Sequence, residues 1–296
     1  MVSQKKVNIC SPRILPSEIH VILAFFVCFA LLPSLANGEE FSFRVATLNA
    51  EWLWTPHDGR VDGARFNKGD PSESAYTQEL RFYAGLLHQY DVDVLALSEI
   101  ENEQVAEEFA AQLGSEWVAS FRQGRDTATG QDVAILSKLG KPVLITDFGF
   151  PSGMVEGYKP KRLSKVLGII LEIDARKVGF VTAHLLSKRN DSPKKSAKRM
   201  MQAHAIVKAH NSFENVDAVV LLGDFNDYRS SPVLKTLEKE TQSSNVLTAC
   251  ERYDITENRR YMIDHILFKG VRCKQAFTLD MQSFSDHPML VAEFKF

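Results

Sequence analysis

Residues 219–227 read VVLLGDFND, an apolar run that ends abruptly in polar residues. A short apolar run bounded by a turn signal predicts a buried β-strand. Asp224 and Asn226 stand two positions apart at its end, so their side chains face the same way if the chain stays extended. A carboxylate beside an amide can bind a hard cation and donate a hydrogen bond to a phosphate oxygen. An Asx turn closing a strand uses the same residues, so this stretch alone leaves both interpretations open.

Similar β-rich runs recur along the chain, with helical patterns between several of them. The runs are FSFRVATL, VDVLALSE, DVAILS, KVLGIILEI, KVGFVTAH, YMIDHILF and MLVAEFKF. Residues 73–90 and 193–213 repeat apolar side chains at helical spacing. Pro193 suits the first turn of the second helix, and Ser231 followed by Pro232 predicts the start of a third. This interleaving predicts one α/β domain with helices packed outside β-sheet.

Polar side chains gather where the predicted strands end, as expected of a site carried by loops on a rigid scaffold. Asn49, Glu99 and His184 join Asp224 and Asn226 in this position. Glu99 closes the apolar run LALSEIEN (95–102), where a buried carboxylate needs a partner such as a metal ion. A solvated glutamate near the start of the next helix is the alternative.

The last two runs add a histidine and two carboxylates. Asp286 and His287 precede the strand in SDHPMLVAEF (285–294). Histidine suits proton transfer near neutral pH, and an aspartate beside it can bind metal. In YMIDHILF (261–268), Asp264 and His265 point to opposite faces of an extended strand, so only one can serve the site. We select Asp264, as the carboxylate that orients a distant histidine.

Six motifs in this order resemble the endonuclease/exonuclease/phosphatase superfamily, which includes deoxyribonuclease I, exonuclease III and bacterial extracellular nucleases. The motifs are TLNAEW (47–52), LSEIEN (97–102), TAHLLSK (182–188), LLGDFND (221–227), MIDHILF (262–268) and SDHPML (285–290). Each is weak alone, but the ordered set spans residues 42–296. The resemblance implies an α/β four-layer sandwich, two packed β-sheets flanked by helices, as in deoxyribonuclease I.

The resemblance also implies a metal centre. Glu99 matches the principal Mg²⁺ or Mn²⁺ ligand, with Asn49 and Glu51 nearby and Asp286 as the carboxylate beside the metal. Carboxylates without cysteine ligands suit an oxygen-preferring cation.

Catalytic roles follow in the same way. Asp224 and Asn226 match the pair that orients the attacking water and contacts the scissile phosphate. His287 matches the histidine paired with Asp264. His184 matches a second active-site histidine, and Asp132 is the carboxylate expected to steady it.

Two basic stretches predict a polyanionic substrate. KPKRLSK (159–165) and KRNDSPKKSAKR (188–199) flank His184 in sequence. We expect Arg162, Lys165, Lys195 and Arg199 to contact backbone phosphates without reading bases. The alternative is an ordinary solvated loop and helix face. With the motifs, the stretches indicate a metal-dependent phosphodiesterase, a nuclease acting on DNA or RNA.

Two other functions stay open. One is a secreted phospholipid or inositol-phosphate hydrolase, resembling sphingomyelinases, because the superfamily hosts several esters on one scaffold. The other is a non-catalytic binding module that kept the fold. The intact acidic and histidine motifs argue against this second alternative.

Residues 1–38 carry the pattern of a signal peptide. The uncharged run VILAFFVCFALLPSLA (21–36) follows basic residues and ends in small ones. It is shorter than the roughly 20 residues that span a bilayer, although a short uncleaved anchor stays open. We expect cleavage near Ala36 or Gly38, a periplasmic or secreted protein without stable membrane association, and a monomer. Residues 39–296 then form a single catalytic domain.

The expected mature chain holds 32 basic and 36 acidic residues, against 35 and 37 in the whole sequence. Its net charge therefore does not by itself indicate a polyanionic partner. Cys250 and Cys273 remain after cleavage, in a compartment expected to be oxidising. A disulfide and two buried free thiols both stay open, because the sequence does not give the distance between their Cα atoms.

Overall fold

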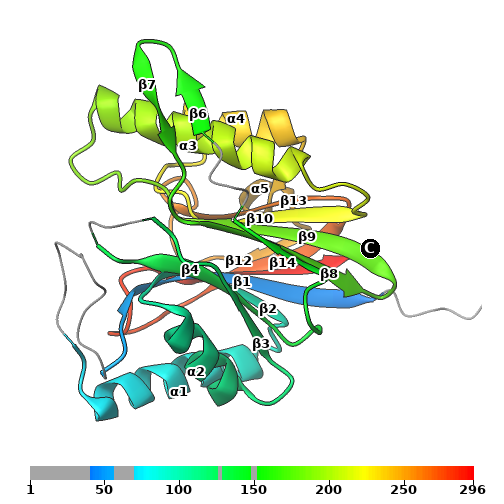
Figure 1. Ribbon diagram of the computed structural model, residues 1–296. Coiled ribbons are helices and arrows are strands. Elements are labelled where there is room, and N and C mark those ends of the chain that lie inside the picture. Colours follow the sequence, from blue (N-terminus) through cyan, green and yellow to red (C-terminus); the bar gives the residue numbers. More distant parts are fainter. Residues whose placement is uncertain (1–40, 57–69, 126–128, 148–151) are drawn as a thin grey trace, which may run out of the picture. The chain divides into compact units, whose positions relative to one another are not determined.

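The computed structural model describes residues 41–56, 70–125, 129–147 and 152–296, so the expected signal segment, 1–38, lies outside the described residues. Two β-sheets lie face to face, and helices cover their outer faces (Figure 1). The described residues form one compact unit. The predicted four-layer α/β sandwich is confirmed.

The first sheet has the strand order β12-β14-β15-β1-β2-β4-β3. Its strands are β1 (Ser42–Leu53), β2 (Val94–Ile100), β3 (Val118–Phe121), β4 (Asp132–Ser137), β12 (Arg252–Asp254), β14 (Arg272–Leu279) and β15 (Met289–Lys295). Helices α1 (Glu73–Gln89) and α2 (Glu103–Leu113) pack on its outer face through a shared apolar core. β1 runs parallel to β2 and antiparallel to β15.

The second sheet has the order β11-β13-β10-β9-β8-β5. Its strands are β5 (Leu144–Thr146), β8 (Val166–Ile173), β9 (Arg176–Ala183), β10 (Ala218–Asp224), β11 (Ser244–Asn245) and β13 (Asp264–Lys269). Helices α3 (Pro193–Asn211) and α4 (Pro232–Thr241) cover its outer face, and the short α5 (Val246–Ala249) follows β11. A separate hairpin, β6 (Ser152–Val155) and β7 (Tyr158–Arg162), packs against α3.

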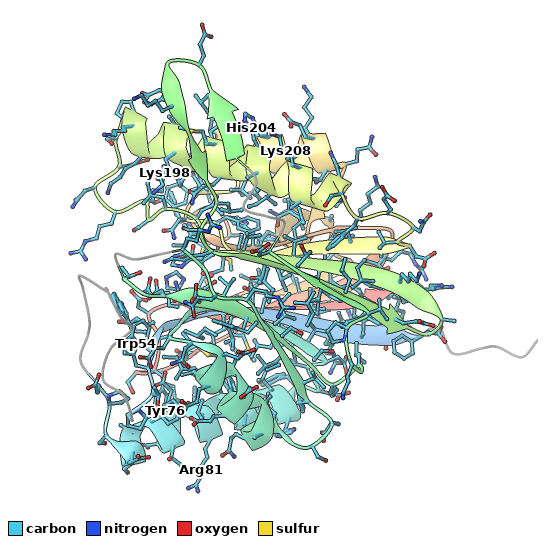
Figure 2. All side chains as sticks on the ribbon, in the orientation of Figure 1. Trp54, Tyr76, Arg81, Lys198, His204 and Lys208 are labelled. Carbon is cyan, nitrogen blue, oxygen red and sulfur yellow. A yellow bond between two sulfur atoms is a disulfide. The ribbon has the colours of Figure 1, made fainter. Side chains whose placement is uncertain are left out.

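Strand alternation separates the layers. On β10, Val220 and Leu222 pack between the sheets, whereas Val219 and Leu221 face α3 and α4. Both faces of the strand are therefore buried, which is why its sequence is continuously apolar rather than alternating. Side chains fill the spaces between the layers (Figure 2). The labelled residues Tyr76 and Lys198 mark helices α1 and α3 in that view.

The predicted helix starts are confirmed. Ser192 caps α3 by accepting a hydrogen bond from the backbone of Lys195, and Pro193 follows in the first turn. Ser231 caps α4 in the same way, with Pro232 next. A side-chain oxygen at this position satisfies a backbone N–H that has no partner inside the helix.

Cys250 and Cys273 form a disulfide, with their Cα atoms 4.6 Å apart. Both residues are buried in the core between the sheets. Of the two interpretations that the sequence left open, the structure shows the disulfide. Separately, none of the helices in the described ranges is long and apolar enough to cross a membrane.

Candidate active site

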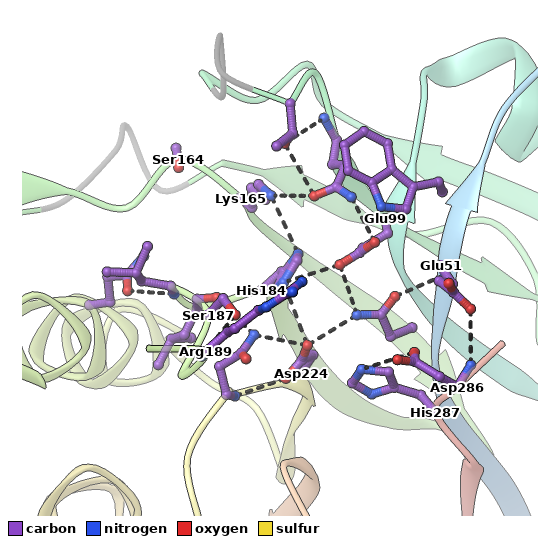
Figure 3. Close-up of a pocket in the computed structure, with 18 of the residues that line it drawn as sticks. Glu51, Glu99, Ser164, Lys165, His184, Ser187, Arg189, Asp224, Asp286 and His287 are labelled. Atoms are coloured by element: carbon purple, nitrogen blue, oxygen red, sulfur yellow. Dashed lines mark hydrogen bonds and ion pairs between the residues drawn. The ribbon is translucent and has the colours of Figure 1, made fainter. Parts of the chain in front are cut away.

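Four of the sequence-predicted side chains meet where two pairs of parallel strands end. Asn49 and Glu99 come from β1 and β2, while His184 follows β9 and Asp224 closes β10. Parallel neighbours end at the same edge of a sheet, and the two sheets are stacked, so these ends converge. They line a pocket of 560 Å³ together with Glu51, Asn226, Asp286 and His287 (Figure 3).

Bulges in β1 and β2 shape one wall of this pocket. The β1–β2 register shifts between Asn49 and Leu53, and the β2–β4 register shifts between Ser98 and Ile100. Glu51 and Glu99 adopt positive φ values of 46° and 62°. A bulge redirects side chains and ends regular pairing, and left-handed non-glycine residues of this kind concentrate at functional sites.

Glu99 is held by two amides. Asn49 donates from Nδ2 to Oε1 of Glu99 at 3.1 Å, and Gln131 donates from Nε2 to Oε2 at 2.6 Å. Gln131 was missed by sequence reasoning, which selected its neighbour Asp132. Its signal was its place directly before a strand, the position that Asp286 and His287 also take before the last strand.

Asp224 connects the two sheets. Its Oδ2 accepts from Nδ2 of Asn49 at 3.0 Å, from the first sheet, and from Nδ2 of Asn226 at 2.9 Å. Its Oδ1 accepts from the backbone N–H of Asn226 at 2.8 Å, which is the Asx turn considered as an alternative. The turn and the site therefore coexist, because Asp224 uses a different oxygen for each.

Gly223 allows strands β9 and β10 to approach each other closely at their ends. Its φ is 141°, and a Cβ there would lie 2.2 Å from the carbonyl oxygen of Ala183 on β9. Only glycine lacks the atom that would collide. The glycine of LLGDFND thus lets the ends of β9 and β10 lie close enough for His184 Nε2 to reach 3.5 Å from Asp224 Oδ2.

His287 and Asp264 lie on the opposite side of Asp224. Nδ1 of His287 and Oδ2 of Asp264 are 2.6 Å apart. His265 points the other way and contacts the backbone carbonyl of Asp227 through Nε2 at 2.9 Å. The alternation of strand β13 thus separates the two residues as the sequence predicts. Asp286 is largely exposed, with Oδ1 3.7 Å from Nε2 of His287.

Burial and neighbouring charges shift the pKa values of the titratable side chains in this pocket. Burial raises the pKa of Asp224, and the negative charge of Asp264 adds to the effect. Burial also raises the pKa of Glu99, against the hydrogen bond from Asn49. Burial favours a neutral His287, but the Asp264 carboxylate outweighs it and raises the pKa of His287 to about 10. These shifts favour a cationic His287 at neutral pH and make Glu99 and Asp224 more basic than ordinary carboxylates.

His184 has a neighbour that the sequence did not suggest. Its Nδ1 lies 3.5 Å from Nζ of Lys165, which also donates to Oε1 of Gln131 at 3.0 Å. The ammonium of Lys165 can only donate, so Nδ1 is the acceptor and Nε2 carries the proton. Asp132, expected to steady His184, accepts from Nε2 of Gln123 and from the backbone N–H of Gly124.

Arg199 does not fit its predicted role as a phosphate contact. It is fully buried. Its Nε donates to Asp227 at 3.1 Å and its Nη2 to Asp191 at 2.6 Å. The helical period places position 199 on the inner face of α3, one turn before Gln202 and Ala203. The prediction was wrong because it counted charge along the sequence without applying that period.

The other predicted phosphate contacts are spread over the surroundings of the pocket. Lys165 is buried but lines the pocket. Lys195 lies outside it and donates from Nζ to the carbonyl of Arg189. The Arg162 side chain lies outside what the structure describes, although its backbone belongs to β7. Arg189 and Lys198, from the same basic stretch, line the pocket directly.

The donor set fits a hard divalent cation. Glu99, Asp224 and Asp286 offer carboxylate oxygens and Asn49 an amide oxygen, the ligands that Mg²⁺ and Mn²⁺ prefer. The raised pKa values of Glu99 and Asp224 show that burial makes their negative charge costly in the protein alone. Ligand atoms of Asp224, Asp264 and His287 also lie within 4.8 Å of one another. In that group Asp264 and His287 already bond to each other, which favours the Glu99 side of the pocket for a cation.

A model described as the Endonuclease/Exonuclease/phosphatase family matches residues 47–287, which include every residue of the pocket described above. No curated protein matches the chain.

Solved structures show the same fold at low identity. An endonuclease/exonuclease/phosphatase family protein from Bacteroides thetaiotaomicron matches with a TM-score of 0.62 at 15% identity, over 87% of this chain and 98% of that one. A mannosyl-6-phosphatase of the same organism gives 0.59 at 15%, over 86% and 100%. The human Nocturnin catalytic domain, with bound sulfate, gives 0.60 at 15%, over 86% and 93%.

Proposed function

Because this chain belongs to the endonuclease/exonuclease/phosphatase family, we propose that it hydrolyses phosphodiester bonds in nucleic acid with a divalent cation, Mg²⁺ or Mn²⁺. Members of the superfamily are generally hydrolases. The observation that carries the proposal is geometric: Glu99, Asp224, His184 and His287 line one pocket. Nε2 of His184 lies 3.5 Å from Oδ2 of Asp224, and Nδ1 of His287 lies 2.6 Å from Oδ2 of Asp264. In-line attack of water on a phosphate diester is assisted by a group that accepts the proton of the water and by positive charge near the phosphate oxygens.

Each group has a role in this proposal. Asp224 accepts the proton of the attacking water as the water oxygen bonds to phosphorus and the bond to the leaving oxygen breaks. His287 donates from Nε2 to a phosphate oxygen, while Asp264 fixes its tautomer through Nδ1. Asn226 and the protonated Nε2 of His184 hold Asp224 and the phosphate in position.

Glu99, Asn49 and Asp286, with Glu51 beside them, are the proposed ligands of the cation. Glu51 accepts from the backbone N–H of Asp286 through Oε2 at 3.1 Å, which ties the two sides of this ligand set together. These residues would hold a divalent cation where it would neutralise charge on the phosphate and on the leaving oxygen.

Nucleic acid is the proposed substrate because the pocket opens beside basic residues. Lys165, Arg189 and Lys198 line it, and backbone phosphates are what such groups bind without base contacts. The alternative is a smaller phosphate ester, a phospholipid or an inositol phosphate. One solved structure of this fold is named a mannosyl-6-phosphatase, so the scaffold also serves a phosphomonoester in that protein.

One assay distinguishes these substrates. The purified protein is incubated with Mg²⁺ and, separately, with plasmid DNA, RNA, sphingomyelin and inositol phosphates. We expect cleavage of DNA or RNA, its loss in EDTA and its return with excess Mg²⁺. Full turnover in excess chelator would contradict the metal requirement, and turnover of a lipid or inositol phosphate alone would replace the nuclease by the smaller-ester alternative.

We also propose that the protein is exported and acts as a monomer in the periplasm or outside the cell, without stable membrane association. The Cys250–Cys273 disulfide supports export, because such bonds persist in oxidising compartments. Mass spectrometry of the exported protein is expected to find a chain that begins near Asn37 or Glu39. A mature chain that keeps residues 1–36 would instead indicate a membrane anchor.

A further inference from the structure

A second pocket of 370 Å³ lies beside the active site, between α3 and the β6–β7 hairpin. Leu186 and Lys198 line both pockets, so the two share a wall. No residue of the catalytic group lines the second pocket. It is a separate binding volume within reach of anything that extends from the active site.

The hairpin and the helix build this pocket together. Glu156 and Gly157 form the tight turn, with Gly157 at a φ of 78°, and Val155 pairs with Tyr158. The hairpin lies against α3 (Figure 1). Lysine side chains from the two elements are thereby brought to one place: Lys159 from β7, and Lys194, Lys195 and Lys198 from the first turns of α3.

The pocket has an excess of positive charge. Four lysines line it and, among the residues that the structure describes there, none is acidic. Lys194 and Lys198 are four residues apart on one helix, a like-charge spacing that disfavours the helix on its own. A concave site lined by one sign of charge concentrates counter-ions of the other sign. The charge therefore points to an anionic ligand.

The rest of the lining is apolar. Met201 is buried, Leu186 lines both this pocket and the active site, and Tyr158 is 39% exposed. An inorganic phosphate would contact the lysine ammonium groups and would leave the apolar part of the lining without a contact. A nucleotide uses both parts, because its base has a flat face that stacks on an aromatic ring while its phosphate meets the ammonium groups.

We propose that this lysine pocket binds the nucleotide next to the scissile phosphate, with its base against Tyr158 and Leu186 and its phosphate at Lys159 and Lys194. The inference rests on the proposed nuclease function and narrows its substrate. A base in this pocket must be unpaired, because a paired base is held inside the duplex stack. Single-stranded nucleic acid is therefore the preferred substrate.

The test uses short single strands with one cleavable phosphodiester among phosphorothioate linkages, which keep the charge. The base on either side of the cleavable linkage is present or replaced by an abasic unit. For the wild-type protein, removing the base on one side should raise KM about tenfold, the size expected of one stacking contact. The Tyr158→Ala variant should already have this raised KM with the intact strand. Removing the base should raise the KM of the variant little further.

The lysines are tested with a matched pair of variants. Lys159→Gln with Lys194→Gln should raise KM and reduce its dependence on salt, with a smaller effect on kcat. Lys235→Gln with Lys239→Gln removes two exposed lysines from α4, outside both pockets, and should leave KM unchanged. The effect of the pocket variant should also be larger on the oligonucleotide than on bis(p-nitrophenyl) phosphate, which has no neighbouring nucleotide.

The outcomes separate the two proposals. If wild-type protein with Mg²⁺ cleaves no nucleic acid, the nuclease function is wrong and the pocket inference fails with it. If it cleaves, but the abasic effect is the same in Tyr158→Ala, or duplex and single strand have equal kcat/KM, the pocket inference alone is overturned.

Discussion

At the scale of single residues, the contact between His287 and Asp264 is the one on which the mechanism depends most directly. The two side chains come from separate segments and meet at 2.6 Å. Asp264 is buried, and its other oxygen, Oδ1, has no hydrogen-bond partner among the described residues. Its hydrogen bonding therefore acts on the site through the imidazole, and its charge also raises the pKa of Asp224.

We predict that His287→Ala lowers kcat about 10²- to 10⁴-fold, the range for groups that act on proton transfer or transition-state charge. Asp264→Asn should give a similar loss, because the imidazole then loses the carboxylate that keeps it charged and oriented. The double variant should be little worse than either single one. Steady-state kinetics measures all three, and strictly additive losses would refute the pairing.

Arg199 illustrates a charged residue whose importance is structural. It bonds to buried Asp227 and to Asp191, and its hydrogen bond lowers the pKa of Asp191 to about 2. Lys188 also reaches Asp227, at 2.6 Å, and its backbone N–H donates to Oδ1 of Asn226. The network therefore fixes the loop that carries Asn226.

We predict that Arg199→Ala lowers the free energy of unfolding by about 1.5–3 kcal/mol, because the buried Asp227 carboxylate keeps Lys188 but loses its charged hydrogen bond from Arg199. Urea denaturation measures the loss. Lys235→Ala, at an exposed position on α4, is the control and should change stability by less than about 0.5 kcal/mol. A stable Arg199→Ala protein with only a raised KM would restore the phosphate-binding role rejected above.

At the scale of elements, the close approach of β9 and β10 decides whether His184 and Asp224 meet. The approach depends on Gly223, because any side chain there would collide with the backbone of Ala183. The collision is with a carbonyl oxygen, which cannot rotate away as a flexible side chain would. The strands themselves would have to separate.

We predict that Gly223→Ala destabilises the fold by more than about 1 kcal/mol, since it adds a clash to an unfavourable positive φ, and that it also lowers kcat. Gly85→Ala is the matched control: a Cβ at this exposed position of α1 meets nothing within 4 Å. That change should stabilise the protein by roughly 0.5–1 kcal/mol through helix propensity. Thermal unfolding and kinetics of both variants give the answer, and a Gly223→Ala enzyme of normal stability and activity would contradict this account.

At the scale of the whole molecule, the disulfide links the two sides of the core and closes the chain between Cys250 and Cys273 into a covalent loop. Cys250 follows α5, next to the second sheet, and Cys273 belongs to β14 of the first sheet, 23 positions later. Neither cysteine lines the active-site pocket. The bond therefore bears on stability rather than on chemistry.

We predict that replacing both cysteines by serine lowers the free energy of unfolding by about 3 kcal/mol, as expected for a closed loop of this length. The activity of the folded variant at 25 °C should match that of the wild type. Denaturation curves with and without reductant test this, because reductant should destabilise the wild type and leave the variant unchanged. Equal stability of the oxidised and reduced wild type would refute it.

Much of the fold could be read from local pattern. The apolar run before Asp224, the serine and proline that begin α3 and α4, and the opposite directions of Asp264 and His265 all depend on residues a few positions apart. Backbone sterics and the periods of helix and strand act over this range, so the sequence carries them directly. The resemblance of the ordered motifs then supplied the two-sheet architecture.

The tertiary structure decided what depends on distant segments meeting. It directed Glu99 into the pocket through a bulge in β2, placed Lys165 beside His184, and buried Arg199 between two aspartates. The sequence determined which residues end the strands, because strand ends depend on steric interactions between residues a few positions apart. It did not determine which charges become partners, because that depends on how two sheets stack and on how much water their packing excludes.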